Sequence, residues 1–304
     1  MYDVIIIGAG PAGCAAAIYA SRKKLNTLLI TQIFGGQAII SDKIENWLGE
    51  INLAGWQLAK KFEDHVRAQE SVTVKSPELA VRVEKIAGGF TTVTDQGKYE
   101  SKAVIVTSGG EHRRLQVPGE KEFEGRGVVY CSTCDAPFYK GKEVAVIGAG
   151  NSGLEAVGDL IPYASKIFLL NRRQEIKGDP AGVDKAKQNP GQVIFYNQTI
   201  VTAIKGDTQV RSIEIKNLVT NEITELPIAG IFVEIGMIPN GDLVKGLVDL
   251  NERGEIIIDH KTAASSCPGI FAAGDVTDAA YKQSNIAAGD GVKAALSAYA
   301  YLKK

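Results

Sequence analysis

Two stretches of the chain repeat the same order of apolar and polar positions. Each opens with a short aliphatic run, DVIII at 3–7 and EVAVI at 143–147. After each run come a glycine-rich turn, a stretch dominated by small apolar residues and a second apolar run, TLLIT at 27–31 or KIFLL at 166–170. Short apolar runs bounded by glycine are typical of buried strands, and the stretches between them have the length of helices. The pattern predicts two strand–turn–helix–strand units.

The two glycine-rich turns read GAGPAG at 8–13 and GAGNSG at 148–153. Both fit G-x-G-x-x-G, in which glycines let the backbone approach a pyrophosphate at a helix N-terminus. The first glycines lie 140 positions apart, and so do Thr31 and Asn171 at the ends of the second apolar runs. A single copy of the motif is often only a structural turn. Two copies, framed alike at equal spacing, predict two dinucleotide-binding folds.

Further apolar runs lie on both sides of the second unit. KAVIVTSGG at 102–110 ends in a turn of small residues, and GIFAA at 269–273 is followed by Gly274 and Asp275. Both are predicted to contain strands of the first fold. The segments GGEHRRLQVPGE and GMIPNGD, rich in glycine and proline, form the crossings between the folds. We therefore predict an α/β protein with two Rossmann-like domains, the second inserted into the first. Residues 1–112 and 244–304 form the outer domain, and residues 113–243 form the inserted one.

Composition and charge argue against several classes of protein. The 304 residues include 34 basic and 35 acidic ones, so there is no basic excess for nucleic acid or a membrane surface. No run approaches the roughly 18 apolar residues of a membrane helix, and the N-terminus lacks the features of a signal peptide. Four cysteines are too few for a secreted disulfide scaffold. We expect a cytoplasmic protein.

Two of the cysteines form a C-x-x-C pair, Cys131 and Cys134, shortly before the second glycine turn. Such a pair can close a disulfide and reopen it by thiol exchange. A structural zinc site usually needs four Cys or His ligands. Cys14 lies in a predicted helix and Cys267 in a predicted loop, neither with a close partner, so no metal site is predicted. Cys14 is expected to be a core residue.

Two dinucleotide folds in one chain suggest FAD and a nicotinamide cofactor, because flavins accept hydride from NAD(P)H. The second strand of the inserted fold is followed by Asn171, Arg172 and Arg173, with Lys177 nearby. An NAD site favours Asp or Glu at this strand end, whereas two arginines can hold a 2′-phosphate. We therefore predict NADPH in this fold; a solvated charge cluster is the alternative. The outer fold has Thr31 instead of an acid, which leaves its ribose contact unassigned.

The chain resembles the low-molecular-weight thioredoxin reductases over essentially its whole length. The shared motifs, in order, are GAGPAG, FGGQ (34–37), IENWLG (44–49), VPGE (117–120), CSTCD (131–135), GAGNSG, NRRQEIK (171–177), GIFAAGDV (269–276) and YKQSNIAAGDGVKAAL (281–296). The downstream half is also similar to the flavoprotein subunit of alkyl hydroperoxide reductase. That relative carries an extra N-terminal disulfide domain, which we expect to be absent because this chain starts at its first strand. The reductases have His-Arg-Arg and a third arginine where this chain has Asn171 and Lys177, and DAPFY replaces their usual sequence after the cysteines.

The resemblance implies two sets of cofactor contacts. FAD contacts are expected at Gly8, Gly10, Pro11, Ala12, Gly13, Gly35, Gly36, Gln37, Asn46, Gly274, Asp275, Lys282, Gln283 and Ser284. NADPH contacts are expected at Gly148, Gly150, Asn151, Ser152, Gly153, Arg172, Arg173 and Lys177. Asp275 could bind a ribityl hydroxyl; its alternatives are a turn or a cap on a helix predicted over 284–302.

The resemblance also implies the activity of a thioredoxin-disulfide reductase. Electrons pass from NADPH through FAD to the disulfide of Cys131 and Cys134, with Cys134 facing the flavin and Cys131 attacking the disulfide of thioredoxin. Asp135 is the candidate general acid, which requires burial to raise its pKa; a helix cap or a turn is the alternative. A homodimer is expected, as is rotation of 113–243 about the two crossings.

Other functions stay open from the sequence. The nearest alternative is an NADH-dependent flavoprotein reductase that serves a glutaredoxin-like or peroxiredoxin partner. A redox sensor that binds nucleotide without useful turnover and a flavoprotein that ignores its cysteines are further hypotheses.

Overall fold

The computed structural model describes residues 1–41 and 43–303. The chain divides into two compact units, described separately below. Unit 1 comprises Met1–Glu111 and Ile238–Lys304, and unit 2 comprises His112–Met237. This division has the insertion that the sequence predicts. The predicted first boundary lies one residue later in the chain than the observed one, and the predicted second boundary lies six residues later.

Hydrogen bonds around Asn240 explain the position of the second boundary. Its backbone N–H donates to Gly109 O at 2.9 Å and its side-chain amide donates to Ser108 O at 3.0 Å. The Ser108 hydroxyl in turn donates to Asn240 O at 2.8 Å. These contacts attach residues 238–243 to unit 1, although the glycine and proline pattern assigns them to the inserted domain. The two crossings themselves pair as a ribbon of β7 (Gly110–His112) and β16 (Met237–Pro239).

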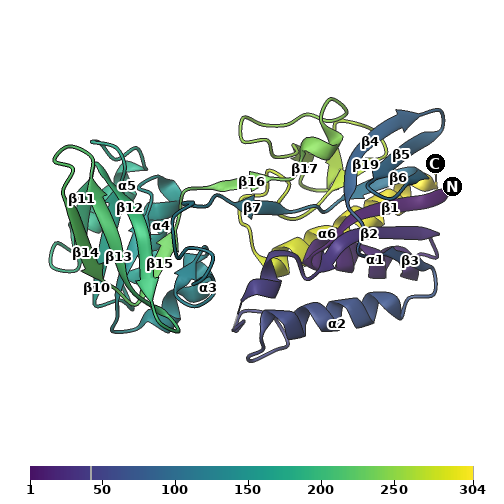
Figure 1. Ribbon diagram of the computed structural model, residues 1–304. Helices are drawn as coiled ribbons and strands as arrows, with labels where there is room; N and C mark the ends of the chain where they lie inside the picture. The colour runs from purple at the N-terminus through teal and green to yellow at the C-terminus, as the bar shows by residue number, and fades with distance from the viewer. Residues whose placement is uncertain (42, 304) are drawn as a thin grey trace. The chain divides into compact units, whose positions relative to one another are not determined.

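A mixed sheet forms the centre of unit 1 (Figure 1). Its parallel part runs in the order β19-β6-β1-β2-β3, with β1 (Tyr2–Ala9), β2 (Thr27–Phe34), β3 (Val72–Lys75), β6 (Lys98–Val106) and β19 (Ile270–Ala272). Antiparallel strands extend it: β4 (Ala80–Ile86), β5 (Gly89–Thr94), β17 (Ile258–Asp259) and β18 (Ala264–Ser265). The short 3₁₀ helices are η1 (Gly36–Ile40) and η3 (Asp242–Val244).

Both faces of the parallel sheet are covered, which is why its strands read as continuous apolar runs. Val4, Ile5 and Ile6 in β1 are each fully buried. Helices α1 (Pro11–Arg22) and α6 (Ser284–Leu302) pack together on one face, and α2 (Gly55–Arg67) lies beside η1. A Cβ on Gly291 of α6 would collide with the backbone of α1, so small residues are required where these helices meet.

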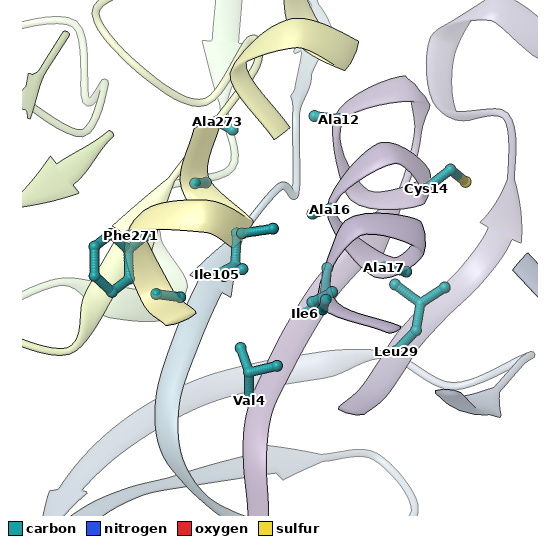
Figure 2. Close-up of a cluster of buried hydrophobic side chains, with 14 of the residues drawn as sticks. Val4, Ile6, Ala12, Cys14, Ala16, Ala17, Leu29, Ile105, Phe271 and Ala273 are labelled. Carbon is teal, nitrogen blue, oxygen red and sulfur yellow. The ribbon is translucent and has the colours of Figure 1, made fainter. Parts of the chain in front are cut away.

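The apolar core between the sheet and α1 contains one of the four cysteines. Figure 2 shows Val4 and Ile6 of β1, Leu29 of β2 and the small residues of α1 in a single apolar cluster. Cys14 belongs to this cluster, and burial raises the pKa of its thiol to about 12. The thiol donates to Ala9 O at 3.3 Å. The prediction that Cys14 is a core residue is confirmed.

Unit 2 contains a parallel sheet in the order β11-β10-β9-β15-β8. Its strands are β8 (Val128–Val129), β9 (Glu143–Ile147), β10 (Lys166–Asn171), β11 (Val193–Asn197) and β15 (Gly230–Val233). Its helices are α3 (Ser132–Asp135), η2 (Ala136–Tyr139), α4 (Asn151–Leu160) and α5 (Pro180–Lys187). A separate antiparallel sheet consists of β12 (Thr199–Gly206), β13 (Val210–Asn217) and β14 (Ile223–Pro227).

The two parallel sheets have the same arrangement around their central strands, and the predicted fold class is confirmed. In each, the strand before the glycine turn is central, with the following strand on one side and a strand from later in the chain on the other. One element differs from its prediction: β2 continues to Phe34, so Thr31 does not end it. Among the described residues, no helix is long and apolar enough to cross a membrane.

Candidate redox and dinucleotide sites

The two glycine turns have nearly the same backbone geometry. Gly8 has φ of 105° and Gly148 has φ of 111°, values that residues with a side chain rarely adopt. A Cβ on Gly8 would collide with the carbonyl oxygen of Thr107, directly after β6. A Cβ on Gly148 would collide with the carbonyl oxygen of Glu234, directly after β15. Glycine is therefore needed at both positions because each turn lies against the end of a neighbouring strand.

The helices that follow these turns begin alike. Gly10 and Gly150 are their N-cap residues, with extended ψ values of −174° and −170°. Neither N-cap makes a side-chain capping hydrogen bond. The first N–H groups of α1 and α4 are thus available to an anion, and the helix dipole favours negative charge at the same place. Both turns fit the pyrophosphate of a dinucleotide.

Three segments of unit 1 meet around the first turn. Gly36, in the FGGQ segment after β2, would place a Cβ 3.2 Å from Gly10 Cα. Gly274, after β19, would place a Cβ 3.2 Å from Ala12 Cβ. Gln37 donates from Nε2 to Gly110 O at 2.9 Å, which holds the FGGQ segment against the chain that follows β6. The structure therefore brings together segments that the resemblance assigns to FAD.

All predicted FAD contacts lie in unit 1. Around the glycine turn, Gly8 lies in β1, Gly10 caps α1, and Pro11, Ala12 and Gly13 form the first turn of α1. After β2, the start of η1 contains Gly35, Gly36 and Gln37, and the next loop contains Asn46. Near the C-terminus, Gly274 and Asp275 follow β19, and Lys282, Gln283 and Ser284 lead into α6. The Asn46 side-chain amide donates to the Gln283 side-chain oxygen at 3.5 Å, so these two distant segments are also adjacent.

Asp275 and Lys282 belong to one small network. Burial raises the pKa of Asp275, and the nearby positive charge of Lys282 opposes this rise. The Lys282 ammonium donates to Asp275 O at 3.2 Å and to Thr277 O, and it pairs with Glu255 at 3.0 Å. These three acceptors match the three hydrogens of an ammonium, so Lys282 supports the loop that carries Asp275. The cap interpretation of Asp275 is wrong, because Gln283 is the N-cap of α6.

The segment after β10 is organised by a buried amide. Asn171 donates from Nδ2 to Glu175 O and to Asn197 Oδ1, both at 3.1 Å, and its Oδ1 accepts from Arg173 N at 3.2 Å. The other end of the segment is held by Asn151, whose Oδ1 accepts from Asp179 N at 2.9 Å. Asn171 therefore shapes the loop, and its side chain is already occupied by protein groups.

The cations of this loop face solvent. Arg172, Arg173 and Lys177 are exposed. Within the part of the chain that the structure describes, none of the three forms a salt bridge. A fixed loop with two unpaired guanidinium groups beside a dinucleotide turn fits a phosphate ligand. Gly148, Gly150, Asn151, Ser152 and Gly153, the remaining predicted NADPH contacts, form the turn and the start of α4.

The cysteine pair lies on the short helix α3. Cys131 is its N-cap and Cys134 its third residue, with Cα atoms 5.3 Å apart and the two sulfurs joined in a disulfide. Cys131 Sγ accepts a hydrogen bond from Cys134 N at 3.2 Å. An amide directed at Cys131 Sγ would also stabilise a thiolate there after reduction. The pair is thus held in a geometry suited to exchange.

Asp135 ends the same helix. Burial raises the pKa of its carboxyl to about 7. The carboxyl is therefore protonated in a substantial fraction of molecules at neutral pH, as a general acid must be. Asp135 is also the N-cap residue of η2, but its side chain makes no capping hydrogen bond there.

Two carboxyl residues that the sequence analysis missed also contact α3. The Ser132 hydroxyl donates to Asp159 Oδ2 at 2.8 Å, and the Thr133 hydroxyl donates to the same oxygen at 3.3 Å. Burial raises the pKa of Glu234 to about 8, while a hydrogen bond from the Ser132 amide lowers it. Glu234 follows β15, and ligands of open α/β sheets bind at the carboxyl ends of strands, so this signal was present in the sequence. Asp159 lies within α4 and gave no such signal.

The remaining cysteines take no part in this arrangement. Cys14 and Cys267 are buried and free, in different apolar clusters. Within residues 1–41 and 43–303, no group of three or more His, Cys, Asp or Glu side chains is placed to hold a metal ion.

Comparison with families and solved structures gives a consistent result. The sequence model described as pyridine nucleotide-disulphide oxidoreductase matches residues 2–291. The structure of thioredoxin reductase from Streptococcus pyogenes MGAS5005 has a TM-score of 0.94 at 34% identity, covering 100% of this chain and 98% of that one. Thioredoxin reductase from Giardia duodenalis has a TM-score of 0.93 at 31% identity, covering 100% and 99%.

Curated relatives include longer proteins. A subunit of alkyl hydroperoxide reductase in Pseudomonas putida is 39% identical over 303 residues, which are 99% of this chain and 58% of that protein. A protein named NADH dehydrogenase from Bacillus subtilis (strain 168) is 39% identical over 301 residues, again 99% and 58%. The chain thus spans somewhat more than half the length of these relatives.

Proposed function

Because the chain belongs to the pyridine nucleotide-disulphide oxidoreductase family, we propose that it is an FAD-dependent reductase that transfers electrons from NADPH, through the Cys131–Cys134 pair, to the disulfide of thioredoxin. The observation that carries the proposal is the closed C-x-x-C disulfide on α3, in the same unit as a dinucleotide turn with two exposed arginines beside it. The likeness to two thioredoxin reductases over nearly their whole length supports the choice of partner.

We assign the two cofactors to the two units. In unit 1, the turn at 8–13 would hold the pyrophosphate of FAD, with the FGGQ segment and Asp275 beside it. In unit 2, the turn at 148–153 would hold the pyrophosphate of the nicotinamide cofactor. When bound, a flavin supplies the ability to accept hydride from a nicotinamide and to pass two electrons to a disulfide.

The preference for NADPH follows from the loop after β10. Arg172 and Arg173 are exposed and unpaired among the described residues, so a 2′-phosphate would meet two available guanidinium groups. The strand-end residue that would bond a ribose hydroxyl in an NAD site is Asn171, and its amide is engaged within the loop.

The thiol chemistry needs only residues of α3. In the reduced protein, Cys131 attacks a partner disulfide and Cys134 then closes the original disulfide, so two electrons and two protons pass to the partner. Asp135 gives a proton to a departing thiolate. Its pKa of about 7 suits this role because the acid and its conjugate base are both populated near neutrality.

Further parts of the proposal concern motion, assembly and location. Gly109 and Gly236 lie at the crossings with φ of 64° and 99°, and glycines there would ease a rotation of unit 2. We propose that such a rotation exposes Cys131 to the partner. We also propose a homodimer in the cytoplasm, where thiols are kept reduced.

A second candidate is an NADH-dependent reductase of a glutaredoxin-like or peroxiredoxin partner. The 39% identity with the alkyl hydroperoxide reductase subunit of Pseudomonas putida favours it. The two candidates differ in the nucleotide and in the acceptor protein, and both use the same cysteine pair.

One experiment separates these candidates. The purified protein is examined for a flavin spectrum and mixed with NADPH or NADH in anaerobic stopped flow, with and without thioredoxin, glutaredoxin or peroxiredoxin. The proposal predicts faster flavin reduction by NADPH and multiple turnovers with thioredoxin. C131S and C134S are the controls, and both must abolish turnover. Turnover that survives either change, or a preference for NADH with peroxiredoxin, contradicts the proposal.

A further inference from the structure

Glu234 lies where the dinucleotide turn at 148–153 meets α3, the short helix of the cysteine pair, which we call the redox helix. Its backbone N–H donates to Ile147 O at 2.8 Å, which places it directly beside the end of β9. A Cβ on Gly153 would lie 3.8 Å from Glu234 Cβ, so the side chain begins alongside the first turn of α4. The carboxyl then reaches the backbone amide of Ser132, the first residue of α3.

The surroundings of this carboxyl disfavour its charged form. Burial is the main cause of its raised pKa of about 8, and the negative charges of Asp159 and Glu155, both on α4, act in the same direction. Within residues 1–41 and 43–303, the Ser132 amide acts in the opposite direction by donating a hydrogen bond to the carboxyl. The cation Arg113 lies against Gly236, two residues after Glu234.

The Ser132 amide is bonded to the carbonyl carbon of Cys131, so Glu234 acts at the covalent neighbour of a redox-active sulfur. Opening the disulfide creates negative charge at that end of α3 unless both sulfurs are protonated. Two negative charges in one partly buried place repel each other, and the cost falls if one of them takes up a proton.

We propose that Glu234 is a positioning residue of the redox helix that takes up one proton when the Cys131–Cys134 disulfide is reduced. At alkaline pH, where Glu234 is ionised in the oxidised protein, two electrons and two protons then enter together. The S–S bond breaks, one sulfur leaves as a thiol and the other as a thiolate, and the second proton goes to Glu234. The inference rests on the proposed function only in that the pair is redox-active.

The sign of the effect follows from linkage. Below the pKa of Glu234 in the oxidised protein, the carboxyl holds its proton in both redox states and has no effect on the equilibrium. Above it, ionised Glu234 opposes formation of the thiolate, so reduction becomes less favourable as pH rises. A neutral glutamine removes this dependence and keeps an oxygen that can accept from the Ser132 amide.

The test measures the equilibrium constant for reduction by dithiothreitol. The full-length flavoprotein and its E234Q variant are equilibrated with reduced and oxidised dithiothreitol, then acid-quenched and alkylated. The reduced fraction of the C-x-x-C peptide is read by mass spectrometry. We compare the equilibrium constant for reduction of E234Q with that of the wild type. We expect their ratio to be near one at about pH 6.5 and to rise about three- to tenfold by about pH 9.5. Ionisation of dithiothreitol cancels in this ratio.

Two controls show whether the effect comes from Glu234. S132A keeps both carboxyls and the backbone amide but breaks the hydroxyl contact with Asp159, and its ratio to wild type must not change with pH. Infrared difference spectra of D135N, in which the neighbouring carboxyl of α3 is removed, reduced minus oxidised at about pH 8.5, must show a gain of protonated carboxyl, including if E234Q fails to fold. A ratio that stays constant with pH, or spectra without that gain, overturn the proposal. Because the electrons in this test come from dithiothreitol, it does not depend on NADPH. A failure of NADPH-dependent turnover would therefore contradict the proposed function and leave this inference standing.

Discussion

The hydroxyl of Ser132 donates to the carboxylate of Asp159 at 2.8 Å, which joins the redox helix α3 to α4, the helix that begins at the dinucleotide turn. Thr133 donates to the same oxygen at 3.3 Å. Ser132, which follows Cys131, is therefore held to α4 in the core of unit 2. Movement of the sulfurs relative to that core must break or stretch these bonds.

Removing Asp159 is expected to slow disulfide exchange without affecting nucleotide binding. In D159A the two hydroxyls lose their acceptor, and α3 becomes less well placed for attack. We expect about a ten- to hundredfold loss of kcat with thioredoxin, the range for a lost hydrogen bond to a charged group. NADPH-dependent reduction of ferricyanide, which takes electrons without the disulfide, serves as the control. An equal loss in both assays would mean that Asp159 acts on nucleotide binding.

The arginines after β10 are expected to carry nucleotide preference. Changing Arg172 and Arg173 to alanine should raise the KM for NADPH about ten- to a hundredfold and leave that for NADH within about twofold, because the 2′-phosphate alone would contact them. K187A, at an exposed lysine that ends α5, is the matched control and should change neither. Parallel steady-state measurements with both nucleotides test this, and an equal rise for both would contradict it.

Gly148 and Gly150 are expected to respond differently to an added methyl group. A Cβ on Gly148 meets a carbonyl oxygen and requires φ of 111°, so G148A should lose about 1–3 kcal/mol of stability. A Cβ on Gly150 has no atom within 4 Å, so G150A should unfold at the wild-type temperature. If a pyrophosphate lies on that turn, G150A still weakens NADPH binding, by about tenfold or more. Thermal unfolding and fluorescence titration of the same samples separate the two effects.

The pH dependence of exchange is expected to follow Asp135. Its pKa of about 7 means that the proton is present below that pH and lost above it. A step that needs this proton should therefore slow by about tenfold per pH unit above about pH 7, once thiol ionisation has been accounted for. D135N should be slower by about a hundredfold or more and lack this inflection. Rapid-mix oxidation of the prereduced protein by thioredoxin, measured across pH, tests this; an inflection that survives in D135N assigns it to another group.

Several parts of the site could be read from the sequence because they depend on neighbouring residues alone. A glycine that must take φ above 100°, followed by a strand-sized apolar run and a helix, leaves a local pattern, and both copies were found at the right positions. The cysteine pair is equally local, since three residues of helix bring its two Cα atoms within bonding reach. The resemblance added the order of the motifs.

Other parts required contacts between distant segments. The end of β2 and the boundary near Asn240 differ from what local patterns indicate, because each is set by pairing with residues elsewhere in the chain. Asp159 and Glu234 escaped notice for the same reason. Nothing near Asp159 in the sequence points to a cysteine pair at least 25 positions away, and the place of Glu234 directly after a strand does not by itself identify those cysteines.

A few adjacent residues are enough to specify the two dinucleotide turns and the exchangeable disulfide, since backbone conformation at glycine and short-range cysteine spacing are local properties. The carboxyls that surround that disulfide are instead chosen by long-range packing. The parallel pairing of β15 with β8 brings Glu234 near Ser132, and the packing of α4 beside α3 brings Asp159 there. Burial in that place changes how readily a carboxyl gives up its proton, and this depends on every segment that excludes water from it.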